Sequence, residues 1–331
     1  MTGPSYRSAG VNLDAAAQAR DLFKPHVRST FGPQVLGDVG LFAGLFQLQG
    51  YKDPVLAAST DSVGTKLLLG QQVGRLDTLG HDIVNHCVND VLTTGARPLF
   101  FLDYIAVEHL VPEQVEQLVK GISEACVQAG CALLGGETAQ LPGIYSKDAF
   151  DLAGFLVGVA ERDAILDPSS VKEGDALVAL PSSGLHTNGY SLVRSVFGLD
   201  DDPSPLHEHP PELGRTLGDT LLEPHRPYWP LLEHVLPLLK AMAHITGGGL
   251  ADNLARIMPD GLRGGIDNAS WKVPAIYRLI QEKGSISDDE MASVFNMGVG
   301  MVLVCPQDRV AQVRSLLPEA WLIGGVTTSH S

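Results

Sequence analysis

The chain has 331 residues, with 44% hydrophobic and 18% charged residues, which is typical of a folded globular protein of about two domains. Its net charge of −15 argues against a nucleic-acid or anionic-membrane partner, because both attract basic surfaces. The sequence has no apolar run near the roughly 18 residues of a membrane span, and residues 1–10 have no apolar segment that would predict a signal peptide. The four cysteines show no C-x-x-C spacing, and three of them, Cys87, Cys126 and Cys305, are predicted to be small core residues, as suits a reducing, cytoplasmic compartment.

The first half of the chain alternates segments of helical and strand period. Helices are expected at residues 15–27, 77–94 and 111–130. Strands are expected at residues 41–48, 54–59, 98–107, 131–136 and 150–161. This order predicts a mixed α/β domain.

A polar joint with Pro, Ser and Gly at residues 167–175 divides the chain into predicted domains 1–168 and 169–331. In the second domain, strands are expected at residues 176–181, 262–267, 300–305 and 320–326. Helices are expected at residues 188–197, 228–242, 249–258, 273–284, 287–295 and 307–317. Residues 200–214 form a Pro-rich, acidic surface loop. The second half is therefore again α/β.

Common phosphate-binding and hydrolase motifs are missing from the sequence. Neither G-x-x-x-x-G-K-[ST] nor G-x-G-x-x-G occurs, and there is no G-x-S-x-G elbow. If the chain binds a nucleotide, it does so in another way.

Three carboxylates stand at the ends of predicted elements, beside Gly-rich turns. Asp61 follows a strand, Asp90 lies near the end of a helix, and Glu137 follows a strand. Hard oxygen ligands in such places suit Mg²⁺, which leaves coordination positions for water and phosphate. Each acid alone also has a simpler interpretation: Asp61 as a turn residue, Asp90 paired with His86, and Glu137 as a helix cap.

Two Gly-rich turns open helices of the second domain, at residues 182–190 and 244–253. Either could hold a phosphate on backbone N–H groups, and the run of three glycines favours this more strongly. The first has a simpler interpretation, compatible with phosphate binding, as a capping turn with Thr187 or Asn188 as the cap. His186 and His244 lie in these turns, and either could be a general base or simply a polar loop residue.

Taken in order, nine segments closely resemble one family, phosphoribosylformylglycinamidine cyclo-ligase, also called aminoimidazole ribonucleotide synthetase. The resemblance runs from Tyr6 to about Gly325. The segments are YRSAGVNLDA, STDSVGTK, CVNDVLTTGARPLFFLDYIA, GGETAQLPGIY, FDLAGFLVGVAE, PSSGLHTNGYSLVR, LLEPHRPY, HITGGGLADN and FNMGVGM.

The resemblance implies the two-domain α/β fold shared with selenophosphate synthetase. It implies a homodimer whose N-terminal domains pair into a β-barrel, with active sites at the subunit interface. It also implies ATP, Mg²⁺ and formylglycinamidine ribonucleotide. The formyl oxygen would attack the γ-phosphate, and the resulting iminophosphate would close to the imidazole ring of aminoimidazole ribonucleotide in purine biosynthesis.

The matching positions carry the implied roles. Asp61, Asp90 and Glu137 would hold Mg²⁺, and His186, His244 and Lys66 are the catalytic candidates. The cofactor-binding set is Gly10, Asp61, Gly64, Thr65, Lys66, Asn89, Asp90, Glu137 and Thr138. The substrate-binding set is Asp151, Ser182, Ser183, His186, Asn188, Gly247, Gly248 and Gly249. Asp151 could equally be a satisfied core carboxylate.

Three residues depart from the family's usual pattern. Ser62 stands where glycine is usual, Gln140 where glutamate is common, and His225 where threonine is usual. Gln140 is therefore not counted as a ligand.

Proteins of the same fold are the nearest rivals. Selenophosphate synthetase would need a reactive Cys or selenocysteine in the N-terminal Gly-rich loop, but no cysteine precedes Cys87. The hydrogenase maturation carbamoyl dehydratase would end in a cysteine, whereas this sequence ends in SHS. Thiamine-monophosphate kinase lacks the two Gly-rich turns in this form, and formylglycinamidine ribonucleotide synthetase is usually much longer. A non-catalytic nucleotide-binding or assembly protein would lack one or more of the three acids or the Gly-rich turns, and this sequence has all of them.

Overall fold

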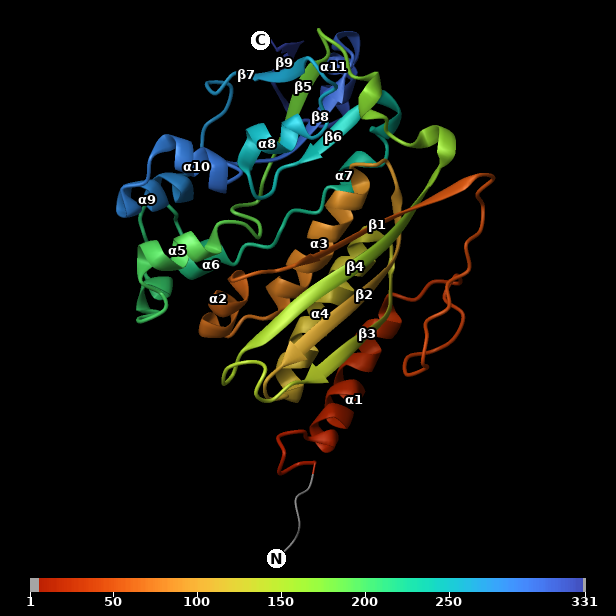
Figure 1. Cartoon of the computed structure of the whole chain (residues 1–331), viewed down its shortest axis with the longest axis vertical. Helices are drawn as coiled ribbons and strands as arrows, with labels where there is room; N and C mark the ends of the chain where they lie inside the picture. Colours follow the sequence, from red (N-terminus) through yellow and green to blue (C-terminus); the bar gives the residue numbers. More distant parts are fainter. Residues whose placement is uncertain (1–5, 330–331) are drawn as a thin grey trace, which may run out of the picture. The chain divides into compact units, whose positions relative to one another are not determined.

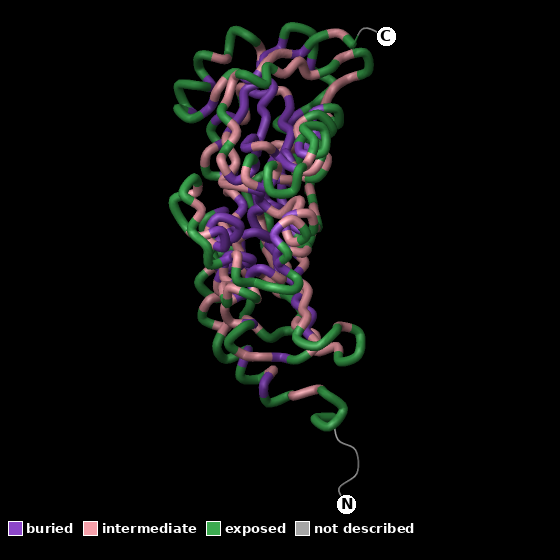
Figure 2. The backbone as a smooth tube through the Cα atoms, turned by 90° about the vertical axis from the view of Figure 1, so that its left-hand side faces the viewer, coloured by how far each residue is buried: buried purple, intermediate pink, exposed green. Residues whose placement is uncertain are grey.

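The computed structural model describes residues 6–329 and divides the chain into two compact units. The first unit runs up to Val88 and includes Pro98–Val159, and the second comprises Asn89–Arg97 and the chain from Ala160 onward. The division lies near the predicted joint, but residues 89–97 belong to the second unit. Each unit has its own buried interior (Figure 2).

The first unit is a four-stranded sheet of order β1-β4-β2-β3 with helices on one face (Figure 1). Its strands are β1 (Pro54–Ser62), β2 (Arg97–Val107), β3 (Ala132–Gln140) and β4 (Phe150–Glu161). Its helices are α1 (Leu13–Ser29), α2 (Lys66–Val73), α3 (Asp77–Leu92, whose end belongs to the second unit) and α4 (Pro112–Ala129). β2 and β3 run parallel, as expected for strands joined through the helix α4.

Two glycines allow α3 and α4 to pack closely. A methyl group on Gly80 of α3 would lie 2.4 Å from the backbone nitrogen of Ile122. A methyl group on Gly121 of α4 would lie 1.9 Å from the carbonyl oxygen of Asp77. Both distances are far below a van der Waals contact, so only glycine permits this approach.

The second unit is a five-stranded sheet of order β6-β8-β5-β9-β7, in which every neighbouring pair is antiparallel. Its strands are β5 (Ala176–Pro181), β6 (Ala241–His244), β7 (Leu262–Ile266), β8 (Val299–Cys305) and β9 (Trp321–Thr328). Its α-helices are α5 (Tyr190–Phe197), α6 (Leu217–Leu221), α7 (Trp229–Leu232), α8 (Gly249–Ala255), α9 (Ala275–Gly284), α10 (Asp288–Val294) and α11 (Val310–Leu316). Short 3-10 turns are η1 (Arg162–Ala164), η2 (Pro168–Ser170), η3 (Ser204–His207), η4 (Leu236–Leu238) and η5 (Gln307–Arg309).

The strand predicted at residues 41–48 is wrong. The segment is irregular, with a single bridge between Val35 and Phe46. Gly44 lies so close to Leu134 that an added methyl group would be 2.7 Å from its carbonyl oxygen, whereas Leu41 and Phe42 face solvent. Residues 41–48 therefore form an irregular surface segment that packs against Leu134 at Gly44.

The single helix predicted at residues 228–242 is also wrong. The structure has the short helix α7, the turn η4 and then the strand β6. Pro230 and Pro237 lie in the second position of α7 and of η4, where a missing N–H is tolerated. Neither proline fits a helix interior, so the run divides.

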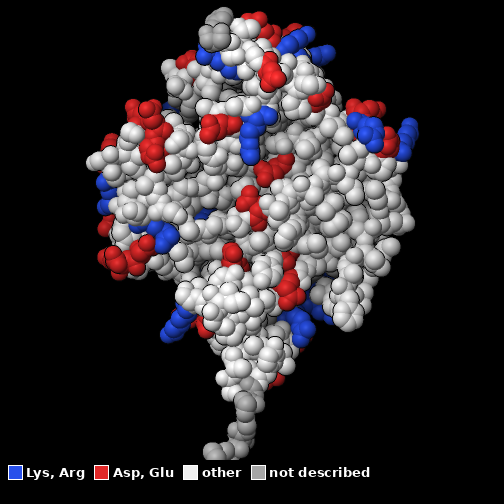
Figure 3. Space-filling view, in the orientation of Figure 1, with Lys and Arg blue, Asp and Glu red and all other residues white. Residues whose placement is uncertain are grey.

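The surface is acidic, as the composition requires. Figure 3 shows Asp and Glu side chains spread over the face that it draws, with Lys and Arg in small separate groups. All four cysteines are buried and free, which confirms the predicted place of Cys87, Cys126 and Cys305 in the core. Within residues 6–329, the structure contains no helix long and apolar enough to cross a membrane.

Candidate active site

Asp61 lies near the end of β1 and is held by two hydrogen bonds. Its Oδ1 accepts the backbone N–H of Ser62 at 2.6 Å, and its Oδ2 lies 2.9 Å from Nε2 of His86 on α3. The Asp61 side chain is 35% exposed, whereas that of His86 is 6% exposed. A buried imidazole that bonds a carboxylate fixes the orientation of the carboxylate. Asp61 is thus an oriented acid with an accessible part.

The turn after β1 leaves room above its backbone. Gly64 has φ +69°, and a methyl group there would meet nothing within 4 Å. Thr65 then stands at the N-cap position of α2 without a side-chain cap bond. This combination suits the approach of an anion to backbone N–H groups.

Lys66 forms a buried ion pair in this structure, so its predicted phosphate contact stays a prediction. Its side chain is 0% exposed, and its Nζ lies 2.7 and 2.9 Å from the two carboxylate oxygens of Asp82 on α3. A buried ammonium needs such a partner, because removing an unpaired charge from water is costly. Lys66 therefore ties α2 to α3 in this structure.

The predicted acid Glu137 lies on β3, where it is exposed, and it does not cap a helix. β3 and β1 are the two edges of the sheet, with β4 and β2 between them. At about 4.8 Å per strand, Glu137 and Asp61 stand at least roughly 14 Å apart across the sheet. The two acids of one chain are therefore too far apart to bind one metal ion.

Sequence reasoning missed Asp103, on β2 next to β3. It is 9% exposed, and a methyl group on the facing Gly136 would lie 2.1 Å from its Oδ1. Burial, and secondarily the charge of Glu137, raises the pKa of Asp103 to about 7. The available signal was an acid at an inward position of an apolar strand.

The Gly10 segment is a tight turn between Tyr6 and Val11. Gly10 has φ +96° and lies against Pro142. Gln140 fastens the segment, because its amide accepts the N–H of Asn12 at 2.9 Å and donates to the Asn12 carbonyl at 3.1 Å. Gln140, which was not counted as a ligand, therefore holds the segment that contains the predicted cofactor-binding residue Gly10.

In the second unit, Asp90 and three histidines form a connected group. Oδ1 of Asp90 lies 2.7 Å from Nδ1 of His244 on β6, so Asp90 has a partner other than the His86 considered above. Nε2 of His244 lies 2.9 Å from Nε2 of His225, whose ring stacks on His186. The three rings are at most 5% exposed, whereas the Asp90 side chain is 33% exposed. His186 and His244, predicted separately, belong to one cluster.

The side chain of Asn296 holds the loop at residues 182–190 through hydrogen bonds. Ser182 Oγ donates to Asn296 Oδ1 at 3.1 Å, and Tyr277 Oη donates to the same oxygen at 2.6 Å. The Asn296 amide donates to the carbonyl of Gly184 at 3.0 Å. Ser183 Oγ donates to the carbonyl of Pro224 at 2.6 Å. Tyr277 and Asn296 were missed, although FNMGVGM pointed to the second of them.

The capping alternative for this loop is wrong. α5 begins at Tyr190, its N-cap is Gly189 at φ +80°, and no side chain caps it. His186 itself has φ +61°, a conformation uncommon for a residue with a side chain. Neither Thr187 nor Asn188 therefore caps α5.

The three glycines of the second turn differ in what they do. Gly247 is exposed, and a methyl group there would lie 3.3 Å from Oδ1 of Asn188, so the two turns adjoin. Gly249 is buried at φ +68°, and a methyl group there would lie 1.8 Å from the carbonyl of Ala292. Asn253 donates to the carbonyl of Gly249 at 2.8 Å. Only the first part of the run can therefore face a ligand, and the predicted role of Gly249 is corrected to packing.

Asn89 makes structural hydrogen bonds here, and its predicted nucleotide contact stays a prediction. It is 0% exposed, its amide donates to the carbonyl of Arg226 at 2.8 Å, and it accepts the N–H of Tyr228 at 3.1 Å. Both ends of its side chain hold the 225–228 segment.

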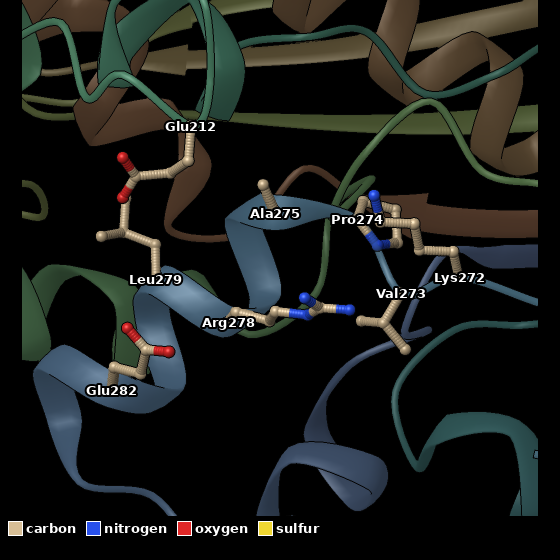
Figure 4. A pocket seen from close by; sticks show the side chains of 8 residues that line it. All are labelled: Glu212, Lys272, Val273, Pro274, Ala275, Arg278, Leu279 and Glu282. Carbon is tan, nitrogen blue, oxygen red and sulfur yellow. The ribbon is translucent and has the colours of Figure 1, made fainter.

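Asp151 and one cavity lie outside the groups described above. Asp151 on β4 accepts the N–H of the next residue, Leu152, at 2.8 Å and is partly exposed, so both interpretations of it stay open. A cavity of about 590 Å³ lies at the start of α9 (Figure 4). Its lining carries both signs of charge and includes no predicted site residue: Glu212, Lys272, Val273, Pro274, Ala275, Arg278, Leu279 and Glu282.

Comparison with known proteins gives the family. Models of the AIR synthase related protein family match the chain, the N-terminal domain at residues 43–160 and the C-terminal domain at residues 172–331. A phosphoribosylformylglycinamidine cyclo-ligase of Desulfitobacterium hafniense is 49% identical over 325 residues, which cover 96% of this chain and 94% of the relative. The chain belongs to the phosphoribosylformylglycinamidine cyclo-ligase family.

Other relatives agree. The cyclo-ligase of Geobacillus kaustophilus is 48% identical and covers 97% of this chain and 95% of its own. That of Myxococcus xanthus is 50% identical, with 95% and 92% covered. The predicted family is confirmed, and with it the class of enzyme, a ligase.

Solved structures of lower identity confirm the fold. The thiamine-monophosphate kinase of Stenotrophomonas maltophilia K279a has a TM-score of 0.69 at 17% identity, covering 94% of both chains. The hydrogenase maturation protein HypE in complex with ATP has a TM-score of 0.69 at 20% identity, covering 97% of this chain and 88% of its own. Two of the rivals considered above therefore share the fold of this cyclo-ligase family member.

Proposed function

We propose that the chain converts formylglycinamidine ribonucleotide and ATP into aminoimidazole ribonucleotide, ADP and phosphate. The observation that carries this proposal is the 46–50% identity to named cyclo-ligases over nearly the whole chain. The two solved structures of the same fold described above are 17% and 20% identical. The buried free cysteines agree with a cytoplasmic enzyme.

In the proposed reaction the formyl oxygen of the substrate attacks the γ-phosphorus of ATP, and ADP leaves. The amine nitrogen then attacks the carbon of the resulting iminophosphate, phosphate leaves, and the imidazole ring closes. Such chemistry needs positioning and charge neutralisation more than covalent catalysis. That requirement fits a site of oriented acids and Gly-rich turns.

The donor set of the first unit fits Mg²⁺ and ATP. Asp61 and Glu137 offer accessible carboxylates on strands, and Gly64 leaves space above its backbone. When bound, Mg²⁺ would neutralise phosphate charge. Asp61 and Glu137 stay the predicted ligands of the first unit, and Asp90 stays the predicted ligand of the second. Lys66 would act indirectly, by fixing α2 at the turn.

The second unit would hold the ribonucleotide. Ser182, Ser183, Asn188 and Gly247 are partly or fully exposed on two adjoining turns. Hydroxyl, amide and backbone N–H donors of this kind suit a phosphate and a polar substrate. His244 has both ring nitrogens engaged within the protein, so it would orient Asp90 and not accept a proton from the substrate directly.

We further propose that the chain is a homodimer formed through the first unit. The outward face of the sheet is apolar and accessible: Leu56 of β1 is 62% exposed and Phe155 of β4 is 44% exposed. Asp61 and Glu137 stand on opposite edges of that sheet, so one ion could take ligands from both only with a second subunit. Both observations support a dimer that completes the metal site.

The proposed function has a direct test. ADP release should require both formylglycinamidine ribonucleotide and Mg²⁺, and it should proceed without glutamine or ammonia. Aminoimidazole ribonucleotide should appear in equal amount. Release of ADP with thiamine monophosphate instead, or only with an ammonia source, would show that the proposal is wrong.

A further inference from the structure

His225 connects the two histidines of the candidate site. Its Nε2 lies 2.9 Å from Nε2 of His244, and its ring stacks on His186 with centroids 3.8 Å apart and planes at 22°. The His225 ring is 0% exposed. It stands where the family resemblance leads one to expect threonine, a shorter residue that has no ring to stack.

The hydrogen bonds define the arrangement of protons. Nδ1 of His244 faces the carboxylate of Asp90 at 2.7 Å, so that nitrogen carries a hydrogen and donates it. The two Nε2 atoms that face each other share one hydrogen between them. With both rings neutral, His225 donates at Nε2 and His244 accepts.

The same three histidines resemble a zinc site, but three observations disfavour that use. Two ligand nitrogens of a tetrahedral zinc stand roughly 3.3 Å apart for bonds of about 2.05 Å, which is longer than the 2.9 Å observed here. The rings of His186 and His225 also lie nearly face to face, and stacked rings cannot direct their in-plane lone pairs at one ion. Finally, Nε2 of His186 already accepts the N–H of Ser183 at 3.3 Å.

The fold holds His225 firmly. Asn89 bonds the backbone of Arg226 and Tyr228, and Tyr228 Oη donates to the carbonyl of Pro181 at 2.8 Å. A methyl group on Gly300 of β8 would lie 1.9 Å from Tyr228 Oη and 2.8 Å from Cε1 of His186. Tyr228 and the His186 ring can therefore pack against position 300 only because that residue is glycine.

We propose that His225 is a positioning residue that fixes the ring and the tautomer of His244, and through it the orientation of the Asp90 carboxylate. Its face also supports His186 in its left-handed backbone conformation. The proposal rests on the proposed function for its catalytic meaning. Its structural content, the tautomer of His244, can be measured without the reaction.

Two variants separate the hydrogen bond from the stack. His225→Phe keeps a ring against His186 and removes the bond to His244, whereas His225→Gln places an amide near the former Nε2. We expect His225→Phe to lower kcat about tenfold with KM for ATP within twofold, the order found for partners of a site's ligands, and His225→Gln to recover most of kcat. Thr220→Val, which loses a hydrogen bond to the carbonyl of Thr216 outside the histidine group, should keep kcat within about twofold.

Nitrogen NMR of the histidine-labelled full chain gives the second measurement. In the unsubstituted protein, His244 should carry its hydrogen on Nδ1 and accept at Nε2, and the Nε2 signal should shift in His225→Phe. The opposite tautomer, an unchanged His244 spectrum, or full activity of His225→Phe would overturn the proposal. Stoichiometric Co²⁺ with tetrahedral absorption bands, lost in His225→Phe, would show a metal site instead and would also overturn it. If the unsubstituted chain does not make aminoimidazole ribonucleotide, the proposed function fails while the spectrum still decides this inference.

Discussion

Asp103 shows how one residue can link the stability of the first unit to pH. Its carboxyl is buried beside Gly136, and burial raises its pKa to about 7, compared with about 3.9 in an unfolded chain. Between these two values the folded state binds the proton more strongly. The stabilisation is therefore complete below about pH 4 and is lost as pH rises through 7.

We expect the free energy of unfolding to fall, relative to Asp103→Asn, by about 1 kcal/mol per pH unit between pH 4.5 and 6.5. The difference should level off above pH 7. Denaturant unfolding in EDTA, so that no metal ion binds Glu137, measures it. A difference that does not change with pH would contradict a raised pKa.

Asp90 tests the site in the second unit. Asn can still accept the hydrogen bond from His244, so Asp90→Asn keeps the contact and removes the charge. We expect kcat to fall roughly 100-fold, with the fold and the dimer kept. The exposed Asp202→Asn serves as the control. Near-normal turnover at low Mg²⁺ would remove Asp90 from the metal ligands.

Lys66 shows what reasoning from sequence leaves undecided at a single residue. A lysine four residues after a strand fits a phosphate ligand equally well as a buried ion pair, and the partner Asp82 is on another helix. If the pair is structural, Lys66→Met should cost about 3–5 kcal/mol of unfolding free energy. The double variant Lys66→Met with Asp82→Leu should recover much of that loss. A rise in KM for ATP at unchanged stability would restore the phosphate role.

Among the elements, long segments with a clear period were predicted well and short ones poorly. α4 and β4 fell close to their expected ranges because each has a continuous pattern. The segment at 41–48 and the start of β6 were missed because the apolar pattern of a short run does not tell a strand from a helix or a surface loop. Tertiary packing at Gly44 and two prolines decided these cases.

Element packing can be tested at the joint of α8 and α10. In Gly249→Ala the new methyl group would meet the carbonyl of Ala292, and the positive φ is strained as well. Gly198 at the end of α5 has φ +67° with nothing within 4 Å, so Gly198→Ala carries only the strain. We expect about 1–2 kcal/mol of destabilisation for Gly198→Ala and at least about 2 kcal/mol more for Gly249→Ala. Equal losses in denaturant unfolding would mean that α10 moves freely.

At the scale of the whole molecule, the candidate acids could be predicted from the sequence, but their arrangement in space could not. Asp61 and Glu137 looked like one site because each follows a strand next to a glycine. The strand order puts them on opposite edges of the sheet, and strand order depends on contacts distant in sequence. Only the family resemblance, with its interfacial active site, anticipated the need for a second subunit.

The proposed dimer makes the last prediction. Phe155 is 44% exposed on the outward face of β4, and a glutamate there would place a charge in the proposed apolar interface. Phe155→Glu should therefore sediment as a monomer and lose most ADP release, because Asp61 and Glu137 of different subunits would no longer meet. Leu316→Glu, on α11 in the second unit and 50% exposed, is the matched control and should stay dimeric and active. A Phe155→Glu protein that is dimeric and fully active would place the interface elsewhere, and a monomeric but active one would show that a single chain holds a complete metal site.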